Sequence, residues 1–235
     1  MFYVKHIGEI VETKHRCLFC NSTLKHLFVD LATCPPSNAF LTAAQCEEPE
    51  VFYPLRAYVC EKCFLVQSPF FKRPQEIFNY DYAYHSSWSP SWVEHAKQYI
   101  DATCERFGLD EHSLIVEIGS NDGYMLQHAL ARKVPCLGID PSSGAASIAQ
   151  TKGIPTITDF FTTALARKLV EQDKQADLVC GINVFAHVPD INDFIEGMRV
   201  LLKPQGVVTM ENLPGLNGLT ICQPSLKNLW NLIRN

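Results

Sequence analysis

The sequence predicts an α/β protein in which a small, cysteine-bearing domain precedes a Rossmann-like parallel sheet. Two observations predict it: two Cys-x2-Cys pairs lie in the first third of the chain, and from residue 113 onward short apolar segments alternate with helical ones. Such alternation is typical of a parallel sheet that helices cover on both faces. At 235 residues, the chain is long enough for one large or two modest domains.

Composition narrows the functional classes. Hydrophobic residues make up 47% of the chain and charged residues 19%, as in a globular protein and not a disordered one. A net charge of −5 gives no basic surface for a nucleic-acid partner, and no apolar run approaches the roughly 20 residues that cross a bilayer. The first residues lack the apolar core of a secretion signal. We therefore expect a cytoplasmic protein with no membrane partner, whose ten cysteines are reduced and not a disulfide framework.

The cysteine pairs predict a zinc-binding domain over residues 10–75. Each Cys-x2-Cys turn presents two thiolates to one side, so two turns supply the four tetrahedral ligands of a closed structural zinc site. The predicted ligands are Cys17, Cys20, Cys60 and Cys63. Short strands are expected at 51–60 and 64–67. Four unrelated buried cysteines, or a nucleic-acid-binding zinc ribbon, are the alternatives, and we expect no role for Cys34 or Cys46.

A helical linker is predicted over residues 76–110. Ser91 and Glu94 have the spacing of a capping box at a helix start, and Gly108 suits a helix end. Between them, apolar side chains recur with helical spacing at Trp92, Ala96, Tyr99, Ile100, Cys104 and Phe107. We expect this helix to pack beside the sheet of the next domain.

The next domain, predicted over residues 111–211, alternates strands with helices. The expected strands are residues 113–118, 135–140, 155–157, 177–183 and 206–211. The expected helices are residues 123–133, 142–152, 163–172 and 191–202. The sequence Pro204-Gln-Gly206 predicts a turn before the last of these strands.

The segment from Glu117 to Gly123 is predicted to bind a cofactor, because it joins the first strand to the first helix at the carboxyl edge of the sheet. Glycine at 119 and 123 lets the backbone turn sharply and approach a ligand. Asn121 replaces the middle glycine of a dinucleotide-binding loop, and carboxylates at Glu117 and Asp122 oppose a pyrophosphate. They suit S-adenosylmethionine (SAM), which carries ammonium and sulfonium groups. An NAD-dependent oxidoreductase is therefore disfavoured, and a plain αβ turn is the remaining alternative. The predicted contacts here are Glu117, Gly119, Asn121 and Gly123.

Three further cofactor contacts are predicted. Asp140 ends the second strand, where a carboxylate can accept hydrogen bonds from both ribose hydroxyls. Asp159 and Phe160 follow the third strand and could meet the adenine amino group and ring face. The alternative for this pair is a helix-start aspartate beside a core phenylalanine.

The chain resembles the sugar C-methyltransferase family, which consists of class I SAM-dependent enzymes that act on nucleotide-linked keto-deoxysugars. The resemblance covers roughly residues 15–211. Its matching stretches are Cys17-Leu-Phe-Cys20, Phe52-Tyr-Pro-Leu-Arg-Ala-Tyr-Val-Cys-Glu-Lys-Cys63, Asp81-Tyr-Ala-Tyr-His-Ser-Ser87, Ser91-Trp-Val-Glu-His95, Val116-Glu-Ile-Gly-Ser-Asn-Asp-Gly123 and Asn183-Val-Phe-Ala-His-Val-Pro189. It implies an N-terminal zinc domain, a central Rossmann-like methyltransferase domain, and a C-terminal domain that helps to hold the sugar nucleotide.

The resemblance also implies an active site. Methylation at carbon requires a base that removes a proton alpha to the sugar ketone and a donor that steadies the enolate oxygen. His187 and Tyr82 lie at the family's active site, with Tyr84 as the alternative to Tyr82. Asn183 is expected near the methionine end of SAM. Without the resemblance, His187 would be interpreted as a helix-capping or core histidine.

The resemblance ends after residue 211. Relatives continue into a helix, a Tyr-His-Glu-His segment with further catalytic groups, the closing strands and the C-terminal domain. Residues 212–235 are instead an atypical tail, in which 224–233 could form a short amphipathic helix. We therefore expect a truncated sheet with an exposed edge at 206–211. Two functional hypotheses follow: a C-methyltransferase for a nucleotide-linked keto-deoxysugar, or a truncated, catalytically inactive relative that holds zinc and SAM. The sequence predicts no oligomeric state.

Overall fold

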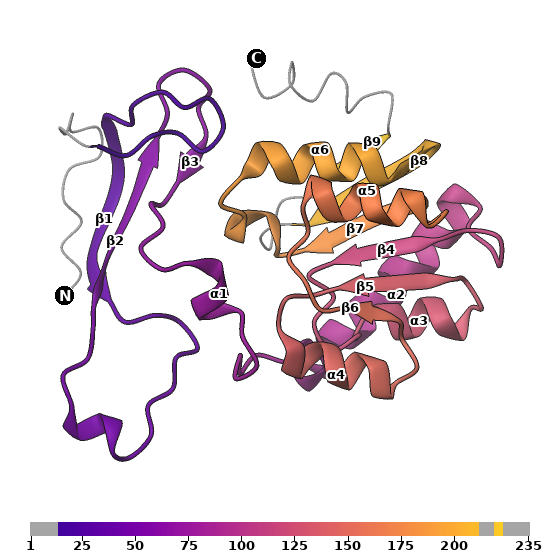
Figure 1. Cartoon of the computed structure of the whole chain (residues 1–235), viewed down its shortest axis with the longest axis horizontal. Helices are drawn as coiled ribbons and strands as arrows, with labels where there is room; N and C mark the ends of the chain where they lie inside the picture. Colours follow the sequence, from indigo (N-terminus) through magenta and orange to yellow (C-terminus); the bar gives the residue numbers. More distant parts are fainter. Residues whose placement is uncertain (1–13, 212–218, 223–235) are drawn as a thin grey trace. The chain divides into compact units, whose positions relative to one another are not determined.

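The computed structural model of the chain describes residues 14–211 and 219–222. They fall into two compact units that meet in the sequence between Ile77 and Phe78, and each unit has its own sheet (Figure 1). No helix in these described ranges is both long and apolar enough to cross a bilayer.

The first unit is built on a three-stranded antiparallel sheet. Its strands, in the order β1-β2-β3, are β1 (His26–Cys34), β2 (Tyr53–Val59) and β3 (Val66–Gln67). Two short helical turns complete it, η1 (Gln45–Glu47) and α1 (Pro74–Ile77). The sequence predicted β2 and β3 but not β1. Its pairing with β2 shifts register twice, which breaks the period-two pattern that marks a strand.

The second unit begins with two segments that lead into its sheet, η2 (Ser86–Trp88) and the long helix α2 (Pro90–Phe107). The cap of α2 is Ser89, whose hydroxyl accepts a hydrogen bond from Trp92 N, so the predicted capping box at Ser91 was two residues too late. Gly108 ends the helix as predicted, in the left-handed conformation at φ 62°.

The large sheet has six strands in the order β6-β5-β4-β7-β8-β9 (Figure 1). The five predicted strands all form and run parallel. They are β4 (Ile115–Ile118), β5 (Cys136–Ile139), β6 (Thr156–Ile157), β7 (Ala176–Ile182) and β8 (Leu202–Glu211). A sixth strand, β9 (Leu219–Cys222), pairs with β8 in the antiparallel sense. The prediction of an exposed edge at 206–211 was therefore wrong, while the predicted helix at 224–233 lies outside the described residues.

The predicted turn at residues 204–206 lies within β8. Leu202 pairs with Ala176, and the next pair is Val207 with Leu178, so the extra residues form an irregularity in the ladder and do not interrupt the strand.

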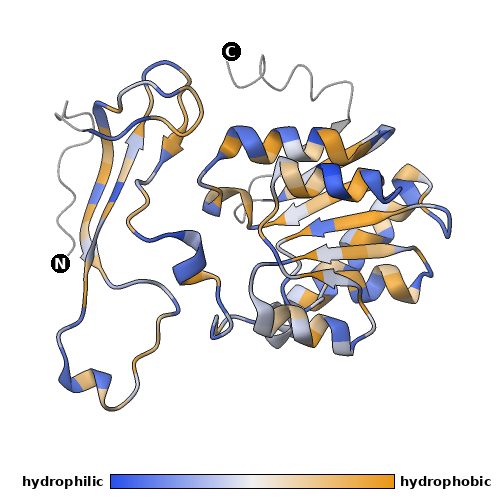
Figure 2. Ribbon diagram, viewed as in Figure 1, coloured by the Kyte–Doolittle hydropathy of each residue, from blue (hydrophilic) through white to orange (hydrophobic). Residues whose placement is uncertain are grey.

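Helices cover the sheet (Figure 1), and its strands are rich in hydrophobic residues (Figure 2), such as Ile115, Val116 and Ile139, whose side chains are buried. They are α3 (Leu126–Ala131), α4 (Ser143–Thr151), α5 (Thr163–Glu171) and α6 (Ile191–Leu201), with the short turn η3 (Phe185–His187) after β7. Ala96 and Ile100 of α2 share a buried cluster with Ile115 and Cys180 of the central strands. Because β4, β5, β6 and β7 are parallel, their carboxyl ends lie along one edge of the sheet, and the predicted cofactor residues lie at that edge.

Candidate functional sites

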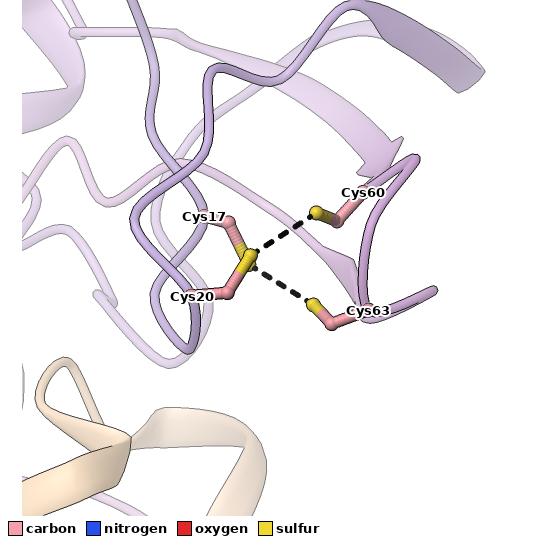
Figure 3. A group of neighbouring side chains, drawn as sticks. All are labelled: Cys17, Cys20, Cys60 and Cys63. Atoms are coloured by element: carbon pink, nitrogen blue, oxygen red, sulfur yellow. Dashed lines mark hydrogen bonds between the residues drawn. The ribbon is translucent and has the colours of Figure 1, made fainter. Parts of the chain in front are cut away.

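The four predicted zinc ligands converge in the first unit (Figure 3). The sulfur atoms of Cys17 and Cys63 lie 3.5 Å apart, as do those of Cys20 and Cys60, and all four lie within 4.8 Å of one another. Zinc bound tetrahedrally at about 2.3 Å from each sulfur separates the sulfurs by about 3.8 Å. The donor set and its dimensions therefore fit zinc with all four positions filled by protein.

The two cysteine turns have the same local geometry. Asn21 N donates to Cys17 O and Phe64 N donates to Cys60 O, each at 2.9 Å. In both turns the residue after the second cysteine is left-handed, with φ 58° at Asn21 and φ 60° at Phe64. Asparagine tolerates this conformation, whereas a bulky phenylalanine is rarely found in it, so the turn geometry is imposed by the site.

Burial and hydrogen bonding shift the pKa values of three of the thiols in different directions. Burial raises the pKa of Cys60 and of Cys63. Burial also opposes ionisation of Cys20, but hydrogen bonds with Ser22, Cys60 and Cys63 together outweigh it and lower the pKa of Cys20 to about 6. Because zinc binds thiolates, a bound cation would compensate the cost of ionising the buried pair.

Gln67 supports this site from outside the ligand set and was not predicted. Its Nε2 donates to the Cys17 sulfur at 3.3 Å, and its Oε1 accepts a hydrogen bond from Leu18 N at 2.8 Å. Such second contacts orient metal ligands. The only signal in the sequence is a polar residue at the end of the apolar run 64–67.

The cofactor loop, residues 119–123, follows β4 as predicted. Gly119 and Gly123 are left-handed, at φ 71° and 75°. A β-carbon at Gly119 would lie 3.1 Å from Cγ2 of Val184, and one at Gly123 would meet Ile154 and Ala149. Glycine at 123 is therefore required for packing against α4 and the chain after it, a role distinct from the ligand approach that we predicted.

Three carboxylates gather around the loop. Glu117 is fully buried, and within the described part of the chain its carboxylate oxygens make no hydrogen bond. Burial, followed by the charges of Asp140 and Asp122, raises the pKa of Glu117 well above its ordinary value, although the nearby Tyr124 hydroxyl opposes the change. Asp140 is buried too, and its two oxygens accept hydrogen bonds from Asn121 N and Ser142 N, each at 2.8 Å. Burial raises the pKa of Asp140, although these hydrogen bonds oppose the change.

These residues fit SAM. A concentration of buried carboxylates favours a cationic ligand and opposes a pyrophosphate. Each oxygen of Asp140 accepts one backbone hydrogen bond and keeps a second lone pair, so it can still accept from ribose hydroxyls. The fit rests on Glu117, whose unsatisfied buried oxygens are costly until a positive group lies near them.

Asp159 and Phe160 lie at the same edge of the sheet. Asp140 N donates to Ile157 O at 3.0 Å, which aligns the ends of β5 and β6. Asp159 is exposed and accepts a hydrogen bond from Phe160 N, whose own side chain is half-buried. The cap of α5 is Thr162, so the alternative interpretation of Asp159 as a helix-start residue was wrong.

The two predicted catalytic residues meet on one aromatic ring. The Phe78 ring lies 5.1 Å from the Tyr82 ring and 5.7 Å from the His187 ring, both in edge-on contact. His187 belongs to η3, which follows β7, and is exposed in part. Loss of water around the rest of the ring lowers the pKa of His187. Phe78 was not predicted, because nothing local in the sequence marks it.

Asn183 begins the segment that leads to His187. It is left-handed at φ 55°, its side chain is exposed, and its N–H donates to Glu211 O at 2.7 Å. The next residue, Val184, is the one that faces Gly119. The segment 183–187 therefore lies beside the cofactor loop.

The sequence also missed the segment that crosses this loop. The backbone at Tyr84 and Ser86 hydrogen-bonds to the Asn121 side chain, and Ser87 donates to the carboxylate of Asp122. The stretch 81–87 belonged to the family resemblance, but pairing between two irregular segments leaves no periodic signal.

Two family models match the chain, one around the cysteine cluster and one over the large sheet. Residues 17–78 match a family model described as "Putative zinc binding domain", and residues 116–208 match a model described as "Methyltransferase domain". The chain thus contains a SAM-dependent methyltransferase domain of Rossmann-like fold, preceded by a zinc-binding domain with four close cysteines. The cofactors of these domains are SAM and zinc.

Individual relatives are consistent with that class. C-methyltransferase NovU of Streptomyces niveus is 33% identical over 162 residues, which cover 69% of this chain and 38% of that protein. The ubiquinone biosynthesis O-methyltransferase of Rhizobium etli is 25% identical over 116 residues, 46% of this chain and 47% of that one. The chain therefore spans less than two thirds of either relative. The solved structure of CalS10, an amino pentose methyltransferase of Micromonospora echinaspora, aligns with a TM-score of 0.41 and 14% identity over 54% of this chain and 53% of that chain.

Proposed function

We propose that the protein transfers a methyl group from SAM to a carbon atom of a nucleotide-linked keto-deoxysugar, in the cytoplasm and without a nucleic-acid or membrane partner. The observation that carries the proposal is the contact of Tyr82 and His187 with the same Phe78 ring, next to a segment that touches the cofactor loop. The match to a protein named as a C-methyltransferase supports transfer to carbon.

When bound, SAM supplies a methyl group on a positively charged sulfur. A sugar carbon becomes a nucleophile only after it loses a proton alpha to the ketone, so the site needs a base. His187 takes that role, because its lowered pKa keeps the imidazole neutral and able to accept a proton at pH 7. The Tyr82 hydroxyl donates a hydrogen bond to the ketone oxygen, where negative charge develops. Phe78 holds both rings in place.

Five other predicted residues would hold the cofactor in this proposal. Asp140 would accept hydrogen bonds from the ribose hydroxyls, and the carboxylate of Glu117 would offset the positive charge of SAM. Asp159 and Phe160 would contact the adenine, and Asn183 the methionine end.

A turnover assay tests the proposal. Purified protein is incubated with SAM and a panel of dTDP-linked keto-deoxysugars, and S-adenosylhomocysteine and methylated sugar are quantified by mass spectrometry. We expect His187→Gln to lower kcat by about 10²- to 10⁴-fold, the range of a lost general base, and to leave the SAM Kd unchanged. The wild-type rate should fall as the pH drops below the ordinary histidine pKa of 6.5, because the base becomes protonated, and His187→Gln should abolish that acid limb. His112→Gln, at an exposed position, is the control.

Comparing Tyr82→Phe with Tyr84→Phe determines which tyrosine acts. We expect a loss of about tenfold or more only for Tyr82→Phe, since a donated hydrogen bond to a developing charge is removed. SAM binding with no product from any sugar would instead support the second hypothesis, a zinc- and SAM-binding domain without turnover. Absence of SAM binding would overturn both.

A further inference from the structure

A segment that we call the strap, residues 80–87, carries Tyr82 and contacts the cofactor side of the sheet at both of its ends. At the first end, Tyr80 O lies so close to the start of α4 that a β-carbon at Gly144 would be 2.5 Å from it. Only glycine permits that approach. At the second end, the strap pairs with the cofactor loop. Tyr82 therefore lies between two points at which the strap is attached.

The attachment at the second end is the side chain of Asn121. Its Oδ1 accepts a hydrogen bond from Ser86 N at 2.8 Å, and its Nδ2 donates to Tyr84 O at 3.1 Å. The amide thus pairs with the strap as a neighbouring strand would, using one donor and one acceptor. Asn121 is buried, and its φ of 49° is left-handed, which asparagine tolerates better than most residues.

The backbone of Asn121 connects the same residue to the cofactor carboxylate. Asn121 N donates to Oδ2 of Asp140 at 2.8 Å. One residue therefore joins Asp140, the cofactor loop and the strap through three hydrogen bonds. Ser87 adds a parallel link, since its N–H and hydroxyl donate to Asp122 of the same loop.

We propose that Asn121 is a positioning residue whose side chain couples cofactor binding at the loop to the placement of Tyr82 on the strap. Its side-chain amide is used by the strap and is not a contact to SAM. A ligand that fixes the loop and Asp140 thereby fixes the strap, because the two share the hydrogen bonds of Asn121. This inference rests on the proposed function in giving Tyr82 a place at the methyl acceptor.

The hydrogen bonds themselves are tested without ligand, by hydrogen–deuterium exchange on the full chain. Asn121→Gly removes the side chain at a backbone conformation that glycine adopts freely. We expect the Ser86 amide to exchange at least tenfold faster in this variant. Asn38→Gly makes the same change at an exposed, left-handed asparagine in the first unit, at φ 60°, and should leave the strap unchanged. Equal exchange of Ser86 in the wild type and Asn121→Gly would overturn the attachment.

The coupling is tested with saturating SAM. In the wild type we expect SAM to slow exchange across residues 80–87, and in Asn121→Gly we expect that protection to disappear. The SAM Kd, measured by calorimetry, should rise by no more than the factor by which SAM slows exchange in the wild type, because the coupling is reciprocal. In turnover, Asn121→Gly should lower kcat by about tenfold with little change in the KM for SAM. Gly144→Ala, which displaces the other end of the strap, should speed exchange near Tyr80 and leave Ser86 protected.

Three results would overturn the proposal. Strap protection that persists in Asn121→Gly would show that the coupling takes another route. A loss of SAM affinity above tenfold with protection retained would make Asn121 a cofactor contact. A wild-type protein that binds no SAM would overturn the proposed function and the coupling together. The exchange measured without ligand would still test the hydrogen bonds between Asn121 and the strap separately.

Discussion

Both units of this protein contain a cluster of groups that ionise to anions, but they support it in different ways. In the first unit the cluster is four cysteine thiols around a common centre. In the second unit it is the carboxylates of Glu117, Asp122 and Asp140 around the cofactor loop. Each cluster suits a cation, zinc in one and SAM in the other. What differs is whether the surrounding fold can stand without it.

Apart from its cysteines, the first unit has few buried apolar side chains to stabilise it. Among residues 14–77, the buried apolar residues other than cysteine are Phe19, Leu24, Leu27 and Tyr58. So small a core leaves little stability once chain entropy is subtracted, which is why domains of this size rely on metals or disulfides. The zinc site is therefore part of the fold.

The second unit has a core that tolerates an unfavourable group. Glu117 lies on the central strand β4 with no hydrogen bond to its carboxylate in the described part of the chain, yet the unit has an extensive core that includes Ile115, Met125 and Cys180, all fully buried. The packing of the sheet and helices offsets the cost of that carboxylate. Its cation can therefore bind and leave while the fold persists, as a consumed cofactor requires.

Removal of a zinc ligand should have the largest effect. We expect Cys60→Ser to abolish stoichiometric zinc and to unfold residues 14–77, because structural zinc contributes on the order of 10 kcal/mol to such domains. Zinc content by mass spectrometry, with hydrogen–deuterium exchange of β1 and β2, measures it. Cys46→Ser, at an exposed cysteine, should keep its zinc. Loss of protection in β4 and β5 as well would contradict the independence of the second unit.

Removal of the carboxylate of Asp140, which we propose binds the ribose, should have a smaller effect and leave the fold intact. Asp140→Asn should weaken SAM binding by about 10- to 100-fold, since hydrogen bonds to a charged group contribute about 1.5–3 kcal/mol. SAM at a hundred times its Kd stabilises a protein by about 2.7 kcal/mol, so at the same concentration the thermal shift of the variant should be about half that of the wild type or less. Asp173→Asn, at an exposed aspartate, should shift as the wild type does. An unchanged SAM Kd in Asp140→Asn would remove Asp140 from the cofactor site.

The same contrast explains what could be predicted from sequence. The parallel strands and the helices of the second unit were predictable because buried parallel strands are continuous apolar runs, and the errors at their ends are small shifts, such as the helix cap at Ser89 in place of Ser91. The antiparallel strand β9 was not predicted. The zinc ligands were predictable because their spacing is local. In contrast, β1 was missed, since its register shifts hide the alternation.

Contacts between distant irregular segments were also missed. The hydrogen bonds of Asn121 to Tyr84 and Ser86, and the shared contact of Tyr82 and His187 with Phe78, leave no periodic pattern in the sequence. Such contacts depend on how loops cross at the edge of the sheet, and this follows from tertiary packing.

The smallest expected effect is a gain in stability. The pKa of Glu117 is raised in the folded protein. Below its ordinary value of 4.5 the side chain is protonated in both the folded and the unfolded state, so the shift does not change the free energy of unfolding there. As the pH rises above that value the unfolded state ionises, folding must take up a proton, and stability falls. Glu117→Gln removes this dependence. We expect ligand-free Glu117→Gln to be more stable than the wild type by about 1–3 kcal/mol near pH 8, and by less near pH 5.

Thermal unfolding at the two pH values, with and without SAM, measures this gain. With saturating SAM the difference should shrink or reverse, because the wild-type carboxylate then has a positive neighbour and the variant does not. A variant that is less stable than the wild type at pH 8 without ligand would mean that Glu117 is satisfied in the fold. Glu117 would then need no cation to offset its burial, and the contrast between the two clusters would rest on the sizes of the two cores alone.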